Sequence, residues 1–327
     1  MKVLITTVPF GQVENKPLKD LKSNNIEYVI NPLNRKLQPG ELAELIDDFD
    51  VIIAGTEEID KKVFDKAKKL KFISRVGIGL DSVDLNYARK KGIRGSYTPD
   101  APAPAVAELT IGLMISLIRS VNMSNLNIKN GKWERYFGLR LSEMNIGIIG
   151  MGRIGSGVMR HLKCFNPKNI LVNDVDTSTL SNLSSGVTVC SKDEIYCNAD
   201  LISLHVPLTN DTHNMISFDQ INKMKKSTYL INTARGGIIN EESLIDALRS
   251  GKIAGAAVDT YEEEPYFGDL AKFNNCINTA HMGSMTVDCR SAMEIEATNE
   301  AIRFIKGEDL LSEVPDDEYK VQSFFDK

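Results

Sequence analysis

The stretch that decides the fold is NIGIIGMGRIGSGVMRHLKCF, residues 145–165. A run of isoleucines leads into Gly150-x-Gly152-x-x-Gly155, and an amphipathic segment starts at Arg153. At this spacing the first glycine makes a tight turn, the second lets a pyrophosphate approach the backbone, and the third lets a helix pack on the strand. The helix N-terminus then offers N–H groups and partial positive charge to phosphates. Taken alone, the stretch is also compatible with a plain strand–turn–helix.

A carboxylate about twenty residues further along favours a dinucleotide site. Asp174 ends the next apolar run, ILVND, where a side chain can accept hydrogen bonds from ribose hydroxyls. Its negative charge repels a 2′-phosphate, and no arginine follows it closely. The glycines and Asp174 together therefore predict a βαβ unit that binds NAD in preference to NADP.

Apolar runs and amphipathic stretches alternate along the whole chain. Before residue 100 we expect strands at 2–6, 27–30, 51–54 and 72–75, with helices near 16–24, 41–47, 61–69 and 83–91. After residue 144 we expect strands at 145–149, 169–173, 200–204, 228–232, 254–258 and 276–279, with helices at 153–164, 241–250 and 285–306. Short strands separated by helices are typical of parallel sheets. The predicted fold class is therefore α/β, with two Rossmann-like, doubly wound parallel sheets.

Between the two series the stretch YTPDAPAPAVAELTIGLMISLIRS holds prolines at 99, 102 and 104. Proline restricts its own backbone and pushes the preceding residue toward extended conformations. We therefore expect a stiff connector followed by an apolar helix over 106–118, which together make a domain hinge. The polar tail EVPDDEYKVQSFFDK is expected to pack loosely on one domain.

Length and composition narrow the class of protein. A chain of 327 residues suits two domains, and a net charge of -5 without a basic patch argues against a nucleic-acid partner. The N-terminal apolar run reaches Pro9 and Gly11 too early for a signal peptide or a membrane span. Five scattered cysteines without a CxxC pair indicate free thiols in a reducing cytoplasm. Four histidines without metal-ligand spacing predict that the protein has no metal site.

Polar residues follow several of the later predicted strands, at the edge where open α/β sheets bind ligands. They are His205 with Val206 and Pro207; Thr233, Ala234 and Arg235; Asp259 with Glu264 beyond it; and His281. Singly, Arg235 could be a surface arginine, Glu264 a solvated glutamate and His281 an ordinary loop histidine. Together, a cation, a carboxylate and an imidazole at one edge predict a site for hydride transfer to a substrate.

Seven sequence blocks, taken in order, resemble the signature motifs of the D-isomer-specific 2-hydroxyacid dehydrogenase family. They are RVGIGLDSVDL, AVAELTIGLM, IGIIGMGRIG, HVPLTNDT, INTARGG, VDTYEEEP and AHMGS, and they extend over essentially the whole chain. The resemblance implies an NAD-dependent oxidoreductase that acts on a small 2-hydroxy or 2-keto acid. It also implies a flavodoxin-like substrate domain of residues 1–100 and 286–327, with an NAD-binding domain of residues 101–285 inserted into it. The glycine-rich turn comes late in the chain because of this insertion.

The resemblance implies a catalytic set of Arg235, Glu264 and His281. His281 would give a proton to the keto oxygen as general acid and take it back in the reverse direction. Glu264, within hydrogen-bond reach, would favour the imidazolium form. Arg235 would hold the substrate carboxylate and polarise the carbonyl with a planar fork of donors that lysine lacks.

The resemblance also implies a set of binding residues. The pyrophosphate would be met by the three glycines with Arg153 and Ile154, and the ribose by Asp174. The other implied cofactor contacts are His205; Val206, Pro207 and Thr212 on the adenosine side; Thr233, Ala234 and Asp259 at the nicotinamide end; and Gly283 beside the catalytic histidine. The backbone N–H groups of Ile78 and Gly79 would bind the substrate carboxylate.

The identity of the acid is left open by the sequence. Phosphoglycerate dehydrogenases resemble the segment around Arg75 and use an arginine there for phosphate, paired with a second arginine near position 54. Here position 54 is alanine, and the nearby Glu57 and Glu58 would repel phosphate. We therefore favour an unphosphorylated 2-keto acid over phosphoglycerate, with an NAD-sensing regulatory protein and a formate dehydrogenase as further alternatives on the same fold. Ala280 departs from the family, which usually has proline there, and is expected to loosen the loop.

The segment NIKNGKWERYFG holds the only tryptophan, Trp133. Exposed aromatic residues in such a segment suit a symmetric dimer interface, and local packing is the alternative. Because family members usually dimerise through the cofactor domain, we expect a homodimer.

Overall fold

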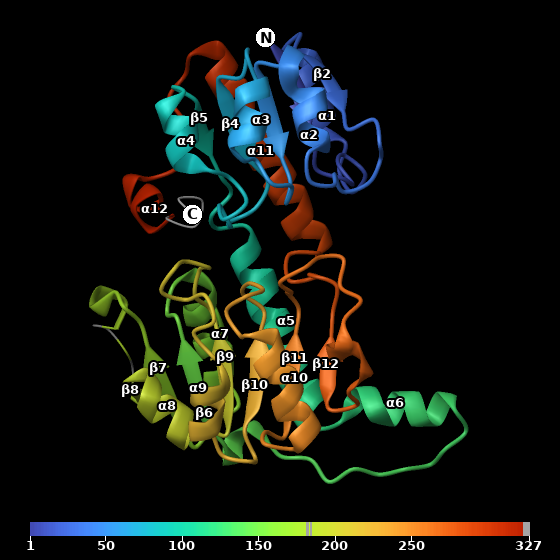
Figure 1. The fold of residues 1–327 in the computed structure, drawn as a ribbon, viewed down its shortest axis with the longest axis vertical. Helices are drawn as coiled ribbons and strands as arrows, with labels where there is room; N and C mark the ends of the chain where they lie inside the picture. Colours follow the sequence, from blue (N-terminus) through green and yellow to red (C-terminus); the bar gives the residue numbers. More distant parts are fainter. Residues whose placement is uncertain (181–182, 184, 323–327) are drawn as a thin grey trace. The chain divides into compact units, whose positions relative to one another are not determined.

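The computed structural model describes residues 1–180, 183 and 185–322 of the chain. It divides into two compact units, Met1–Pro102 together with Met285–Lys327, and Ala103–Ser284 (Figure 1). Each unit is built on one parallel sheet with helices on its faces. This arrangement confirms the predicted fold class.

The first unit has a five-stranded sheet in the order β2-β1-β3-β4-β5, which is the flavodoxin order. Its strands are β1 (Lys2–Ile5), β2 (Glu27–Ile30), β3 (Val51–Ala54), β4 (Phe72–Arg75) and β5 (Arg94–Ser96). Its helices are α1 (Lys16–Ser23), α2 (Glu41–Leu45), α3 (Lys61–Lys66), α4 (Leu85–Lys90), α11 (Val287–Lys306) and α12 (Asp316–Val321).

The sheet of the first unit is buried on both faces. Every residue of β3 and β4 is buried, as expected for central strands of a parallel sheet. The helix α11 packs against these two strands beside α1, and Phe72 stacks on Phe304 with ring centroids 4.4 Å apart. Apolar residues of α2, α3 and α4 form a cluster with side chains from the same strands.

The second unit has a seven-stranded sheet in the order β12-β11-β10-β9-β6-β7-β8. Its strands are β6 (Asn145–Ile149), β7 (Asn169–Asn173), β8 (Val187–Val189), β9 (Leu201–Leu204), β10 (Tyr229–Asn232), β11 (Gly255–Val258) and β12 (Cys276–Asn278). Its helices are α6 (Val121–Lys129), α7 (Arg153–Lys163), α8 (Lys192–Asn198), α9 (Phe218–Lys223) and α10 (Glu241–Ser250), together with α5 (Pro102–Ile118), which begins at the boundary between the units. The strand order reverses between β6 and β9, where sheets of this topology place a bound dinucleotide.

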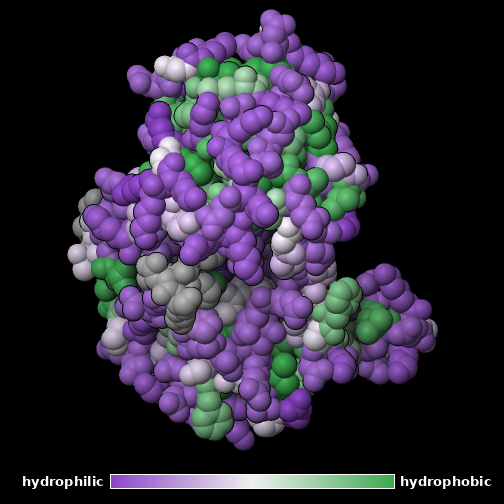
Figure 2. All heavy atoms as spheres, turned by 45° about the horizontal axis from the view of Figure 1, so that its top comes forward, coloured by the Kyte–Doolittle hydropathy of each residue, from purple (hydrophilic) through white to green (hydrophobic). Residues whose placement is uncertain are grey.

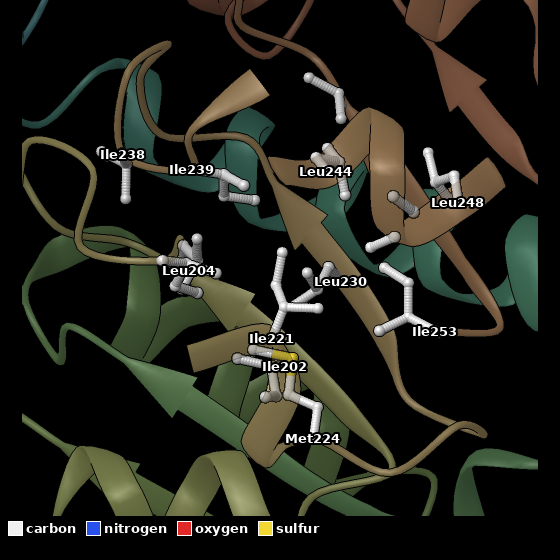
Figure 3. Close-up of a cluster of buried hydrophobic side chains, with 14 of the residues drawn as sticks. Ile202, Leu204, Ile221, Met224, Leu230, Ile238, Ile239, Leu244, Leu248 and Ile253 are labelled. Atoms are coloured by element: carbon white, nitrogen blue, oxygen red, sulfur yellow. The ribbon is translucent and has the colours of Figure 1, made fainter. Parts of the chain in front are cut away.

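Two apolar cores cover the two faces of this sheet. One combines β9, β10 and β11 with α8, α9 and α10, and Figure 3 shows Ile202, Leu204 and Leu230 of the strands facing residues of α9 and α10. The other combines α5 and α7 with β6 and β7 and includes Met114, Val158 and Leu162. These cores hold the ends of the central strands in place.

Several elements differ from the sequence-based expectations. Strands β5 and β8 were not predicted, because β5 consists of Arg-Gly-Ser without an apolar run and β8 is a three-residue edge strand with two exposed residues. The helix α6 was also missed, since it buries none of its residues and therefore has no apolar stripe. The helix α5 begins at Pro102 rather than at residue 106. Prolines fit a first helical turn because its N–H groups have no intrahelical acceptor.

The tail also differs from the expectation of loose packing. It forms α12, and Val314 and Gln322 on either side of that helix are buried. Arg89 of α4 donates a hydrogen bond to Asp316 at 2.6 Å, and its guanidinium lies over the ring of Tyr319. Residues 313–322 of the tail are therefore held by specific contacts within the first unit, and residues 323–327 lie outside the described residues.

Among the helices of the described residues, none alone has the length and apolar character needed to cross a membrane. The pair α5 and α6 meets this criterion together, with a bend of 65° between the two helices.

Candidate active site

The glycine-rich turn lies at the carboxyl end of β6. Gly150 has a φ of +96°, a conformation that favours glycine, and a Cβ there would overlap the carbonyl of His205. A Cβ on Gly155 would overlap the carbonyl oxygen of Gly150, so this glycine lets α7 approach the strand closely. Gly152 precedes the first helical residue Arg153, and apart from its two chain neighbours no described residue has an atom within 4 Å of its Cβ position. The turn therefore has open space at the N-terminus of α7, which Arg153 and Ile154 begin.

Asp174 follows β7 and lies against this turn. Its Oδ2 accepts a hydrogen bond from the Met151 N–H at 2.5 Å, and its Oδ1 accepts one from the Asp176 N–H at 2.8 Å. The structure thus brings Asp174 next to the glycine-rich turn through a backbone contact that the sequence did not predict.

The loop after β9 carries His205, Val206, Pro207 and Thr212. Nε2 of His205 lies 2.8 Å from Ser203 Oγ, and burial lowers the pKa of this histidine to about 3. The imidazole is therefore neutral at physiological pH. Val206 lies behind Gly150, and the Thr212 hydroxyl donates to the Pro207 carbonyl at 2.5 Å, which closes the loop on itself.

The loop after β10 carries Thr233, Ala234 and Arg235. Asn232, 2% exposed, holds this loop by accepting from the Ala234 N–H at 3.1 Å and donating to the Arg235 carbonyl at 2.8 Å. The hydroxyl of Thr233 lies 2.8 Å from that of Thr110 in α5. Asn232 was not singled out from the sequence, although its place at the end of the strand in INTARGG could have indicated this role.

Gly236 connects the Arg235 loop with the next loop of the sheet. A Cβ at this position would overlap the carbonyl of Tyr261 and lie 2.5 Å from the Glu262 nitrogen. The backbone of Gly236, the residue after Arg235, is therefore in direct contact with the backbone of Tyr261 and Glu262. Since β10 and β11 are neighbours in the sheet, this contact fixes the Arg235 loop against the loop that carries Glu264.

Asp259, which is fully buried after β11, anchors the loop that carries His281. Its carboxylate accepts hydrogen bonds from the Thr279 hydroxyl at 2.6 Å, the Met282 N–H at 2.7 Å and the Gly283 N–H at 2.8 Å. Its carbonyl accepts from the His281 N–H at 2.8 Å. The sequence suggested a contact of Asp259 with the cofactor and did not show this anchoring role.

The Glu264 carboxylate and the His281 imidazole form a direct pair. The Nδ1–H of His281 lies 3.0 Å and 3.1 Å from the two carboxylate oxygens, and the Tyr261 N–H donates to Glu264 at 3.3 Å. The side chains are 33% and 22% exposed, so both are sheltered and still accessible to a small molecule. His281 has a φ of +50°, which is uncommon for a residue with a side chain and is often found at functional sites.

The predicted substrate residues Arg75, Ile78 and Gly79 lie at the carboxyl end of β4 in the first unit. Arg75 is 5% exposed, and its guanidinium donates to the Val76 carbonyl at 2.6 Å. Gly77, two residues after Arg75, donates from its N–H to the Thr98 hydroxyl at 2.7 Å, and its carbonyl accepts from the Thr98 N–H at 3.1 Å. Thr98 is another residue that the sequence did not indicate.

Comparison with known proteins agrees with this geometry. The profile described as D-isomer specific 2-hydroxyacid dehydrogenase, NAD binding domain, matches residues 111–283. The chain is 39% identical to D-3-phosphoglycerate dehydrogenase of Methanocaldococcus jannaschii over 82% of its own length, but it spans only 52% of that relative. It is 37% identical to glyoxylate reductase of Thermofilum pendens over 82% of both chains.

Solved structures show the same architecture. The TT0316 protein of Thermus thermophilus superposes with a TM-score of 0.86 at 30% identity, over 96% of this chain and 100% of that one. The profile match, the two relatives and this structural likeness lead to one conclusion: the chain belongs to the D-isomer specific 2-hydroxyacid dehydrogenase family and contains its NAD-binding domain.

Proposed function

We propose that the protein is an NAD-dependent oxidoreductase that transfers hydride between NAD(H) and a small 2-hydroxy or 2-keto acid. The observation that carries this proposal is the hydrogen-bonded pair of Glu264 and His281 at the carboxyl edge of the cofactor sheet. Arg235 follows β10, which is separated from β12, the strand before His281, by β11. The loop of Arg235 is fixed against the Glu264 loop at Gly236. A proton donor and a carboxylate-binding cation thus share one edge with the glycine-rich turn.

The second unit fits a dinucleotide. Gly150 and Gly155 permit a backbone turn that a side chain would block, and the space beside Gly152 leaves the N-terminus of α7 open to a pyrophosphate. Asp174 lies beside this turn at the place for a ribose. When bound, NADH supplies the hydride that reduces a carbonyl carbon.

Proton transfer and binding of the substrate are assigned to side chains of the protein. With Nδ1–H donated to Glu264, the opposite ring nitrogen of His281 is the one that gives a proton to the substrate oxygen, and it takes the proton back when a hydroxy acid is oxidised. Glu264 holds the ring in this orientation. Arg235 binds the substrate carboxylate, since a guanidinium can donate two parallel hydrogen bonds to it. In the first unit, the N–H groups of Ile78 and Gly79 are assigned to the substrate carboxylate by the family pattern.

The remaining binding roles follow the family pattern. We assign Val206, Pro207 and Thr212 to the adenosine side, with His205 packed behind the turn. Thr233, Ala234 and Asp259 are assigned to the nicotinamide end, with Gly283 beside them. NAD is preferred over NADP because Asp174 is followed by a second carboxylate, Asp176, and both repel a 2′-phosphate. Equal turnover with NADH and NADPH would contradict this assignment.

We favour an unphosphorylated acid as the substrate. The buried carboxylate of Glu57 lies at the carboxyl edge of the first sheet, where it accepts hydrogen bonds from the Thr6 hydroxyl and, at 2.9 Å, from the Gly55 N–H. Glu57 follows β3, and Arg75 is the last residue of the neighbouring strand β4, where it pairs with Ala54. A buried carboxylate in this region disfavours a phosphate dianion. D-3-phosphoglycerate is the second candidate, favoured by Arg75.

A homodimer through the segment 121–139 is also proposed. The helix α6 and the chain after it stand off the sheet of their unit (Figure 1), and a few hydrophobic residues are visible among the polar ones on this projecting lobe (Figure 2). Trp133 is 83% exposed, and the side chains of Ile128 and Phe137 are exposed as well. Such a surface is typical of an interface between subunits. A monomeric mass in light scattering would contradict this proposal.

A cytoplasmic location fits the cysteines, all five of which are free thiols. Detection of the natural protein in a secreted fraction would contradict this location.

A panel of 2-keto acids, with and without phosphate, tests the proposed function by the loss of NADH absorbance. We expect turnover, with the highest kcat/KM for an unphosphorylated acid. A marked preference for phosphohydroxypyruvate would replace the first candidate by the second. Binding of NADH without turnover of any keto acid would contradict the proposed activity and indicate an NAD-sensing protein.

A further inference from the structure

One polar side chain near the end of the chain is buried against a loop far from it in sequence. Gln322 follows α12 and is 9% exposed. Its amide bonds to three backbone groups of the segment 80–85, more than 230 residues earlier in the chain. A buried amide with both its donor and acceptor groups used is costly to replace, because each backbone partner would lose its hydrogen bond.

The contacts of Gln322 complete the local hydrogen bonding of the segment 80–85. Its Oε1 accepts from the Leu85 N–H at 2.7 Å, and Leu85 is the first residue of α4, whose N–H has no acceptor within the helix. Its Nε2 donates to the Leu80 carbonyl at 2.6 Å and also to the Val83 carbonyl. In return, Asn86 donates from its side chain to the Gln322 carbonyl at 3.1 Å.

The segment held by Gln322 directly follows Ile78 and Gly79. On the other side of these two residues, Gly77 exchanges two hydrogen bonds with Thr98. The loop is therefore anchored at Gly77 and again at Leu80. Both residues between the anchors are partly exposed, and neither donates its N–H to an acceptor within residues 1–180, 183 and 185–322.

We propose that Gln322 is a positioning residue for substrate binding, which rests on the proposed function of Ile78 and Gly79. The bond to the Leu80 carbonyl fixes the peptide between Leu80 and Asp81, one residue beyond Gly79, and, with the Thr98 anchor, restricts the direction of the two N–H groups between the anchors. These groups bind the carboxylate of a 2-keto acid. The tail that carries Gln322 thereby acts as a latch on the substrate loop without touching the reacting atoms.

The latch affects substrate binding rather than the chemical step. The groups proposed to move the proton, His281 and Glu264, belong to the second unit, whereas the hydrogen bonds of Gln322 are made within the first unit. We therefore expect Gln322→Met, which keeps the length of the side chain and removes its hydrogen bonds, to raise KM for the keto acid about tenfold. The values of kcat and of Kd for NADH should stay within about twofold of the wild type.

A matched control changes a residue of α12, the helix before Gln322, that has no hydrogen bond or ion pair with the segment 80–85 among the described residues. Asp316→Ala removes the exposed hydrogen-bonded pair with Arg89 and leaves the Gln322 contacts in place. We expect this variant to have the wild-type KM. Amide hydrogen exchange adds a direct readout of the latch, because the Leu85 N–H should exchange faster in Gln322→Met and at the wild-type rate in Asp316→Ala.

A second measurement uses only the wild-type chain. Coupling between two binding events is reciprocal, so a latch that tightens substrate binding tenfold is itself tightened about tenfold by the substrate. Oxamate, an unreactive analogue of a 2-keto acid, should therefore slow exchange of the Leu85 N–H when it is added with NADH. This measurement applies even if Gln322→Met does not fold.

The outcomes separate the latch from the proposed function. A raised KM with unchanged kcat, and slower Leu85 exchange with oxamate, support the latch. An unchanged KM in Gln322→Met, equal losses in both variants, or Leu85 exchange indifferent to oxamate would overturn it while leaving the proposed function intact. Absence of wild-type turnover on every keto acid contradicts the proposed function and, with it, the substrate role of the latch.

Discussion

The carboxyl edges of the two parallel sheets are built in different ways. In the second unit, glycines leave the backbone turn without side chains, and the proposed catalytic groups are the side chains of His281, Glu264 and Arg235. In the first unit, the proposed ligands are the backbone N–H groups of Ile78 and Gly79, and their loop is held by side chains from elsewhere in the chain. The proposed function thus uses side chains at the edge of one sheet and main-chain groups at the edge of the other.

The largest expected effect tests the side-chain chemistry of the second unit. Replacing His281 removes the proposed proton donor, so kcat should fall by about 10²–10⁴ while Kd for NADH is unchanged. Two variants of His281 distinguish the loss of the imidazole from the strain of a positive φ at this position. Asparagine tolerates the φ of +50° at this position, whereas alanine does so less well. Both His281→Asn and His281→Ala should lose activity, and only the alanine variant should also lose thermal stability.

Turnover close to the wild-type value in His281→Asn would remove the imidazole from the mechanism. The difference between the edges of the two units would then not lie in side-chain chemistry.

A second prediction compares two glycines of the turn, Gly155, which packs against protein atoms, and Gly152, which faces the proposed pyrophosphate site. A Cβ on Gly155 overlaps the Gly150 carbonyl, so Gly155→Ala should lower the free energy of unfolding by about 1–3 kcal/mol. A Cβ on Gly152 meets no described atom within 4 Å, so Gly152→Ala should unfold like the wild type. It should weaken NADH binding, because the methyl group occupies the space for the pyrophosphate. Calorimetric melting and NADH titration measure the two effects.

The reverse pattern, with a destabilised Gly152→Ala and unaltered NADH binding, would show that the turn does not hold the cofactor.

The difference between the two edges also explains how much could be predicted from sequence. Side-chain chemistry and glycine turns leave short motifs, so the strand ends at Arg235, Glu264 and His281 could be singled out, and the two parallel sheets follow from alternating apolar runs. An anchor such as Gln322 leaves no motif, because its partners are backbone groups more than 230 residues away. Strand β5 was missed for a related reason: it is specified by its neighbour β4 and not by its own composition.

The anchoring role of Asp259 was missed because a carboxylate at a strand end has the same sequence signature whether it binds a ligand or a loop. Only the three hydrogen bonds from the segment 279–283 to its carboxylate show that it holds the loop of His281 in place.

A third prediction concerns the other histidine at the edge of the second unit. His205 is half-buried, and its Nδ1 atom is buried without a hydrogen-bond partner within the described part of the chain. Burial of the imidazole lowers its pKa from 6.5 to about 3. Below pH 6.5 the unfolded chain therefore binds a proton that the folded chain does not, and stability is lost as the pH falls from 6.5 toward 3. Between pH 7 and pH 5 this loss amounts to about 2 kcal/mol.

Urea unfolding at pH 7 and pH 5 measures this loss, and the variant His205→Gln isolates the contribution of the imidazole. The difference in unfolding free energy between the two pH values should be about 2 kcal/mol smaller in the variant than in the wild type. Identical differences would mean that His205 takes up a proton in the folded state.

The smallest expected effect tests whether the edge of the first unit selects against phosphate. Glu57 is buried there, whereas its neighbour Glu58 is exposed, so the two carboxylates offer a matched pair. Glu57→Gln should raise kcat/KM for a phosphorylated keto acid relative to the unphosphorylated one by about tenfold, since a buried charge is poorly screened. Glu58→Gln should change this ratio by less than about threefold, because solvent and salt screen an exposed charge. Equal changes in the two variants would show that Glu57 acts only through the net charge of the protein, and the first edge would then bind the substrate carboxylate without selecting against phosphate.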